Sequence, residues 1–422
     1  MSKDWAKVNN QEQIHWRKRV EAELKGKSFD SLIQRIGEQE IQPMYFDHEH
    51  IAPSNAQNAW HIHEEFTGTD AKGLNAQILL ALQGGAQSIG IPYIAGEMHQ
   101  LLKDVFVEYV QVHLRGVSDF HACLKEMADL LKQRQLNYNA WQGSVDVNPV
   151  QCNSAAIQEL HDNWKNTFTR VRFFAIDSSA IHDTGVDPTA ELVHLLWHSN
   201  VALDALTNAG LTTDDASAMM HWRMGIGTDF ITETAKFRSW RVLWDALIRA
   251  YHPQHNCSAH TIVHAHMSCA EYSLRDTHNN LLRISTAVLS AALGGAQFIS
   301  ADAYTQLSAE VSAGDRRITR NIQHLLIEEG SMNQYLDAAD GAHYFEATTE
   351  ALAHEAWSRF KFIVQQGEDA LSAYLNESAW RRKEEILSGK HVVVGSNKYI
   401  DSSKKISATP EATHISAVAE RT

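Results

Sequence analysis

Histidine pairs separated by a single residue are the first candidates for chemistry in this 422-residue chain. Three such pairs occur: His48/His50, His61/His63 and His264/His266. Residues two apart on a β-strand share a face, so either of the last two pairs could point into the mouth of a barrel. Imidazole nitrogen is also a common ligand of zinc. The pairs therefore raise the hypothesis of a metal-dependent enzyme.

A metal-dependent barrel hydrolase would combine one such pair with histidines and an aspartate from later strands. His61, His63, His264 and Asp337 could be assembled into that scheme. A zinc site needs three or four convergent ligands and supporting hydrogen bonds, whereas the sequence shows only pairs. Chance pairs are expected among 24 histidines. We therefore predict no metal and keep the hydrolase as an alternative.

Five residues near the ends of expected strands define a candidate, vestigial pocket at a barrel mouth: Tyr93, Asp177, His264, His266 and Asp302. Active sites of such barrels lie at the carboxyl ends of the strands. His264 and His266 could belong to a retained substrate pocket or could be hydrogen-bonded filling of an axial pore. The filling is favoured, because location in a fold is only an analogy. Asp177 precedes two serines and is more typical of a loop cap than of a general base. We predict no catalytic residue.

Short β-rich runs that alternate with helical segments would position these residues. The runs cover residues 86–93, 105–114, 144–150, 170–177, 216–226, 260–268, 296–304 and 333–340. They follow one another at intervals of about 35 residues, the length of a strand, a helix and two loops. Alternation of this kind indicates a parallel sheet, and eight strands predict a closed (β/α)8 TIM barrel, an α/β fold.

Further segments complete the predicted organisation. Residues 1–55 form an N-terminal subunit-contact arm with an amphipathic helix, and residues 56–345 form the barrel. Residues 346–400 form a post-barrel helical and extended segment. The small, polar residues of 401–422 predict a mobile tail. The arm and the post-barrel segment lie outside the repeating pattern, and the arm in particular suggests an interface.

Composition argues against several classes of protein. The chain has 37 Lys and Arg against 51 Asp and Glu, a formal charge of -14, and this excess repels phosphate backbones. Its four cysteines lack C-x-x-C spacing, which indicates buried thiols in a reducing compartment. We find no run of about 18 apolar residues and no signal-peptide pattern. We therefore expect a cytoplasmic protein with neither a nucleic acid nor a membrane as partner.

Four stretches carry a distinctive pattern of glycines, arginines and aromatic residues. They are GLNAQILLALQGGAQSI at 73–89, MGIGTDFITETAKFRSWRVLW at 224–244, RDTHNNLLRISTAVLSAALGGAQFI at 275–299 and a block at 316–357 that opens with RRITRNIQ. In this order they resemble the methylmalonyl-CoA mutase family. The resemblance extends over nearly the whole chain up to residue 400 and is greatest to the small, or beta, subunit.

The resemblance implies that catalytic members hold CoA through the barrel axis and use adenosylcobalamin for a radical rearrangement. Three of their features have no counterpart in this sequence. The cobalamin loop D-x-H-x-x-G is imitated only by DTHNNL at 276–281, which has leucine in place of the motif's glycine and lies in a predicted helix. The residues after Gly367 are also too few for a cobalamin domain. The R-Q-Y-A-G and A-F-D-L stretches do not both fit within residues 46–72. Ala180 takes the place of the catalytic histidine, with His182 two residues later.

The resemblance therefore implies a supporting, non-catalytic subunit of an adenosylcobalamin-dependent methylmalonyl-CoA mutase. Such an isomerase interconverts methylmalonyl-CoA and succinyl-CoA in propionate metabolism. The expected partner is the catalytic large subunit, in a heterodimer, with adenosylcobalamin on that partner and no cofactor bound by this chain. A substrate-binding mutase barrel that uses cobalamin from a separate chain is an alternative.

Overall fold

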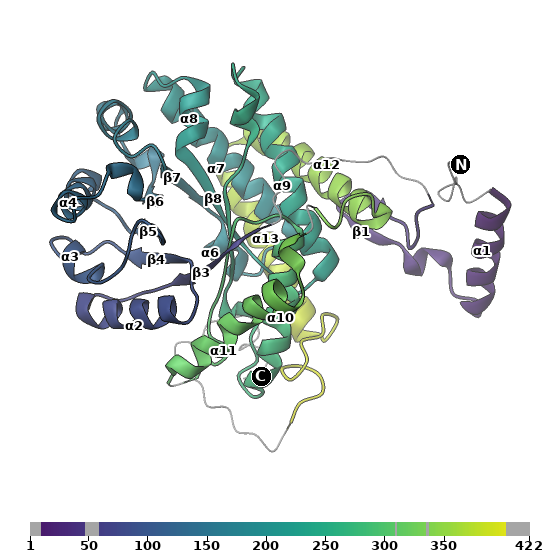
Figure 1. Cartoon of the computed structure of the whole chain (residues 1–422). Coiled ribbons are helices and arrows are strands. Elements are labelled where there is room, and N and C mark those ends of the chain that lie inside the picture. The colour runs from purple at the N-terminus through teal and green to yellow at the C-terminus, as the bar shows by residue number, and fades with distance from the viewer. Residues whose placement is uncertain (1–9, 47–58, 309, 335–336, 402–422) are drawn as a thin grey trace, which may run out of the picture.

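Eight parallel strands form a closed barrel with helices on its outside (Figure 1). The computed structural model describes residues 10–46, 59–308, 310–334 and 337–401. The strands follow one another around the barrel in chain order, and the last pairs with the first. The predicted (β/α)8 barrel is thus confirmed.

The barrel strands are short, and most of their residues are buried. They are β3 (His61–Glu65), β4 (Ser88–Pro92), β5 (Gln111–Arg115), β6 (Gly143–Val147), β7 (Val171–Asp177), β8 (Met220–Gly225), β9 (Val263–Met267) and β10 (Phe298–Ala301). In a strand, alternate side chains face the barrel interior and the surrounding helices. The axis is therefore lined by every second residue of these runs.

Helices between the strands cover the outside of the barrel (Figure 1). They are α2 (Ala71–Gln83), α3 (Met98–Leu101), α4 (Phe120–Gln133), α5 (Ser154–Glu159), α6 (Ser179–Asp183), α7 (Pro188–Asn208), α8 (Thr213–Met219), α9 (Phe230–Ala250), α10 (Thr277–Leu293) and α11 (Ala313–His324). Four of them begin after an aspartate whose carboxylate accepts a hydrogen bond from the first turn: Asp70, Asp119, Asp187 and Asp229. An N-cap of this kind satisfies an amide that has no partner within the helix, and so fixes where each helix starts.

The prediction of a strand at residues 333–340 is wrong in the part of that run that the structure describes. Met332–Gln334 is a single 3-10 turn, and Asp337 has a positive φ of 42°. The run has no β-branched residue, so its propensity for a strand is low. The barrel is closed instead by β3, which pairs with β10 on one side and β4 on the other.

The arm and the C-terminal helices lie outside the barrel. Helix α1 (Asn10–Glu23) stands apart from the barrel at the end of the arm (Figure 1). A hairpin of β1 (Gln34–Ile36) and β2 (Gln39–Ile41) packs on α12 (His343–Gln366). Helix α13 (Glu368–Leu387) follows α12.

Other parts of the predicted organisation fall outside the described residues, namely 1–9, 47–58 and 402–422. These include His48 and His50 and nearly all of the expected mobile tail. Within the described residues, no helix is long and apolar enough to cross a membrane.

Candidate functional site

Four histidines from β3, β5, β8 and β9 lie inside the barrel. They are His63, His113, His221 and His264, and each is at most 3% exposed. The rings of His113 and His264 are 4.5 Å apart between centroids, and those of His63 and His113 are 5.2 Å apart. His221 lies 5.3 Å from His264, whose other face stacks on Phe298 at 4.2 Å. Aromatic rings therefore fill this level of the axis.

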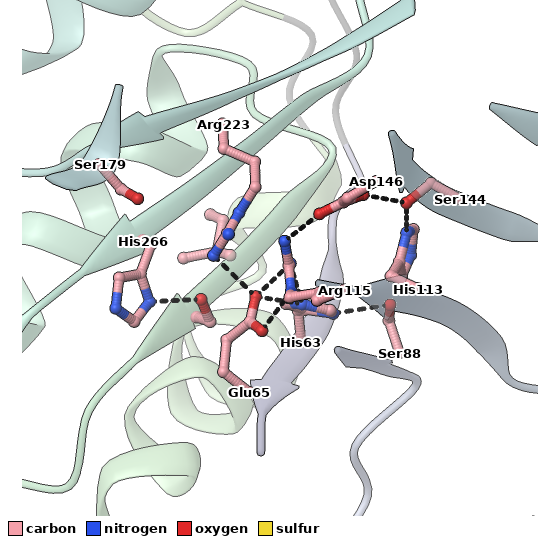
Figure 2. Close-up of polar contacts among 12 residues, drawn as sticks. His63, Glu65, Ser88, His113, Arg115, Ser144, Asp146, Ser179, Arg223 and His266 are labelled. Carbon is pink, nitrogen blue, oxygen red and sulfur yellow. Dashed lines mark hydrogen bonds and ion pairs between the residues drawn. The ribbon is translucent and has the colours of Figure 1, made fainter. Parts of the chain in front are cut away.

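Charged side chains form the next layer, toward the carboxyl ends of the strands (Figure 2). Arg115 donates to Glu65 through Nε at 2.6 Å and through Nη2, and to Asp146 through Nη1 at 2.7 Å. Arg223 donates to Glu65 at 3.1 Å and to Asp177 at 2.7 Å. Each guanidinium thus bridges two carboxylates, as expected for charges that are mostly shielded from water.

The histidine layer and the charged layer are joined by hydrogen bonds. His63 Nε2 lies 2.8 Å from Glu65 Oε1, and His221 Nε2 lies 3.1 Å from Asp146 Oδ1. Ser144, two residues before Asp146, donates to Asp146 at 3.0 Å. The two layers therefore form one polar network across the barrel.

Burial and neighbouring charge set the protonation states in this network. Burial alone would raise the pKa of Glu65 and Asp146, but Arg115 and its neighbours outweigh it and hold the pKa of both carboxylates below the ordinary values. Burial lowers the pKa of His113 and His264 well below the ordinary value, and the adjacent imidazoles and Arg115 add to that effect. The carboxylates are therefore ionised, and these two histidines are neutral.

The predicted pocket residues are only partly brought together. His264 lies on the axis, and His266 lies above it with Nδ1 2.9 Å from Ser300 Oγ and Nε2 3.9 Å from Asp302. Asp177 caps the turn after β7 by accepting from the Ser179 amide at 2.8 Å, while it also pairs with an arginine of the network. Tyr93 does not join them.

Tyr93 instead donates its hydroxyl to Glu126 on α4 at 2.8 Å. The other residues of the hydrolase scheme also separate. His61 stacks on Phe298 at 5.2 Å, and Asp337 forms an ion pair with Arg238 on α9. Of that scheme, only His63 and His264 share a site.

The sequence-based reasoning missed His113, Arg115, His221 and Arg223. A signal was present, because β5 and β8 both carry a histidine and an arginine two residues apart. In a strand this spacing puts both side chains on one face. Two such pairs facing the same axis would have predicted the charged layer.

Two cavities of very different size border the barrel. A cavity of about 20 Å³ lies between β3, the end of β10 and α11, and is lined by Glu65, Asp302 and Arg320 among others. That is room for about one water molecule. A larger cavity of about 770 Å³ lies between the arm hairpin, the start of α7, α13 and the segments that follow β7, β8 and β9, and its lining includes His182, Glu271 and Arg382.

The two segments compared with catalytic motifs adopt helical structure. Thr277 begins α10, and the His278 ring lies 5.8 Å from Tyr304, so this segment is not a loop that presents histidine to a cobalt ion. Ala180 lies in α6 with His182. Burial would lower the pKa of His182, but Glu191, 3.0 Å away, outweighs it and raises that pKa. His182 is thus engaged in an internal ion pair.

Comparison with known proteins defines the class to which this barrel and its filled axis belong. The methylmalonyl-CoA mutase family profile matches residues 127–421, more than half of the chain. The chain belongs to the methylmalonyl-CoA mutase family.

Relatives include proteins named as small subunits, one named as a large subunit and others named methylmalonyl-CoA mutase without a subunit, such as that of Cereibacter sphaeroides, which is 24% identical over 91% of this chain and 64% of its own length. The methylmalonyl-CoA mutase small subunit of Porphyromonas gingivalis is 24% identical over 91% of this chain and 69% of its own length. The small subunit of Streptomyces virginiae is 26% identical over 74% of this chain and 53% of its own length. The large subunit of Porphyromonas gingivalis is 23% identical over 74% of this chain and 44% of its own length. The chain therefore matches between 44% and 69% of the length of these relatives.

Proposed function

We propose that this chain is a supporting, non-catalytic subunit of a methylmalonyl-CoA mutase. A large subunit of the same family would carry adenosylcobalamin, the CoA channel and the radical chemistry. The filled barrel axis carries the proposal. Catalytic relatives are expected to hold CoA along that axis, and in this chain buried histidines and paired charges occupy it.

Opening the axis would be costly. A ligand that entered would have to displace Arg115 from Glu65 and Asp146, whose side chains are 15%, 15% and 13% exposed. Leaving buried carboxylates without a partner costs about 3–5 kcal/mol. A substrate would need to supply that free energy before it gained any affinity. The same argument disfavours a substrate-binding mutase barrel that borrows cobalamin from another chain.

The histidine position supports the same conclusion. Alanine at position 180 has no group that transfers a proton, and the neighbouring His182 is held by Glu191. Because a general acid must reach the reacting group with a free proton, neither residue fits that role.

The arm supports the proposed partnership. Helix α1 and the segments after it leave apolar side chains in water: Ile14 is 52% exposed and Met44 43%. Trp16 contacts Phe29 and Phe46, at 6.1 and 5.6 Å between ring centroids, within the arm itself. A closed barrel does not need an arm to cover its edges. Docking on a large subunit would bury these groups, each worth roughly 1.5–3 kcal/mol when fully buried.

Reconstitution tests the proposal. The full chain should be purified alone and together with the family's large subunit from the same source. We expect the chain alone to retain no corrinoid after incubation with adenosylcobalamin and to isomerise no methylmalonyl-CoA, and we expect the pair to co-purify and be active. Retention of about one corrinoid per chain, or activity of the chain with an isolated cobalamin-binding protein, would refute the non-catalytic role.

A further inference from the structure

Three of the axial histidines converge as metal ligands do. One ring nitrogen from each of His63, His113 and His264 lies within 4.8 Å of the other two. The three residues come from β3, β5 and β9, so they are far apart in sequence and are brought together by closure of the barrel. The sequence predicts no metal because it shows only pairs. The fold adds His113 as the third ring.

Several ring nitrogens of these histidines and of His221 have no hydrogen-bond partner among the described residues. Both ring nitrogens of His264, Nε2 of His113 and Nδ1 of His221 are buried without a hydrogen-bond partner among the described residues. A buried polar atom without a partner costs about 1–3 kcal/mol. The great majority of buried polar groups avoid that cost, so a cluster of four such atoms indicates a missing binding partner.

Hydrogen bonds on the opposite side of the rings orient these nitrogens. Ser144 Oγ lies 2.9 Å from His113 Nδ1, which leaves Nε2 of that ring directed elsewhere. Asp146 holds His221 Nε2, which leaves Nδ1. A ligating histidine commonly uses its second nitrogen in this way, on a carboxylate or another polar group. His63 has both nitrogens bonded, Nδ1 to the Ser88 hydroxyl and Nε2 to Glu65, each at 2.8 Å, so ligation through Nδ1 requires a change of the Ser88 side-chain rotamer.

The charge of the surroundings suits a cation. In the layer above the rings, the carboxylates of Glu65, Asp146 and Asp177 outnumber the guanidinium groups of Arg115 and Arg223, which leaves one net negative charge.

We propose that His63, His113 and His264 bind a divalent transition metal on the barrel axis, with the His221 ring beside the site, 5.3 Å from His264 between centroids. An all-imidazole set favours zinc over the hard cations magnesium and calcium, which prefer oxygen ligands. The site is structural, because burial of the rings leaves no room for a substrate beside the ion. It is independent of the proposed subunit role.

Metal titration of the full chain tests this site. The chain should be stripped with a chelator and titrated with Co²⁺, whose visible absorption reports four-coordinate nitrogen ligation, followed by displacement with Zn²⁺. We expect one ion per chain. His113→Gln and His264→Gln should each weaken binding by more than the roughly 10- to 100-fold typical of a supporting residue. The double variant His194→Gln/His198→Gln is the matched control, because those rings lie 4.3 Å apart on α7, outside the axis.

Each outcome decides the proposal. It fails if binding is far below one ion per chain, if it survives in both axial variants, or if the α7 control abolishes it. If the axial variants do not fold by circular dichroism, X-ray absorption of the zinc-loaded wild type replaces them. Imidazole scattering at about 2.0 Å would support the site, whereas a shell of sulfur, or of oxygen alone, would overturn it.

Discussion

Replacing Arg115 with methionine tests the idea that the barrel axis is one buried, mutually dependent set of charges. Methionine keeps the approximate length and apolar stem of arginine but leaves Glu65 and Asp146 without their shared partner. These three side chains are at most 15% exposed. Breaking a buried ion pair by removing one partner costs about 3–5 kcal/mol. We therefore expect Arg115→Met to lower the free energy of unfolding by about that amount.

Urea unfolding at neutral pH, followed by circular dichroism and tryptophan fluorescence, measures this effect. Arg381→Met is the matched control, because Arg381 pairs with Glu377 on the surface, where the side chains are 57% and 68% exposed. Surface pairs contribute about 0–1 kcal/mol. Adding Glu65→Gln to Arg115→Met should recover part of the loss, since one uncompensated charge is removed. A loss for Arg115→Met no larger than that for Arg381→Met would show that Arg115 does not hold the axial carboxylates in a mutually dependent set.

Other predictions concern protonation, packing and assembly. Burial lowers the pKa of His113, so below about pH 6.5 the unfolded chain takes up a proton that the folded chain does not. From pH 7 to pH 5, the metal-free wild type should therefore lose free energy of unfolding relative to His113→Gln, by up to about 1.4 kcal/mol per pH unit as measured by urea unfolding. Equal pH profiles of the two proteins would contradict this prediction. Gly143 has φ +144°, and an added Cβ would strike the Val112 carbonyl, so Gly143→Ala should lower the free energy of unfolding by about 3 kcal/mol or more. Gly96→Ala is the control and should lower it by about 1 kcal/mol, because nothing lies within 4 Å of the added Cβ. Similar melting temperatures of the two variants would contradict this prediction. Removing residues 1–45 should leave a folded barrel by circular dichroism that no longer captures the large subunit, and unchanged capture would show that the arm is not the interface.

Strand and helix alternation predicted most of the barrel from sequence. The runs at 86–93, 170–177 and 296–304 contain β4, β7 and β10, because apolar β-rich runs bounded by turn residues are typical of buried strands. The sequence HIHEE of β3 was weighed as a metal motif rather than as the strand that closes the barrel. Its polar residues hid it, since polar side chains face inward in this barrel.

The axial network could be predicted only in part. His264 was expected to be hydrogen-bonded filling; it does fill the axis, but neither of its ring nitrogens has a partner among the described residues. Its neighbours His63 and His113 come from strands about 200 and 150 residues away in the chain, and which side chains meet depends on the stagger of the closed sheet. Spacing within one strand carries no information about that stagger. The convergence therefore required the fold.

Acyl-CoA binding to the isolated chain tests most directly whether the barrel axis is filled and whether the chain lacks a role in binding substrate. Calorimetric titration of methylmalonyl-CoA into the full chain should be compared with titration into the large subunit under the same conditions. We expect no saturable heat for this chain at concentrations that saturate the large subunit. Binding at about one acyl-CoA per chain, weakened by substitutions at Arg115 or Arg223, would contradict it.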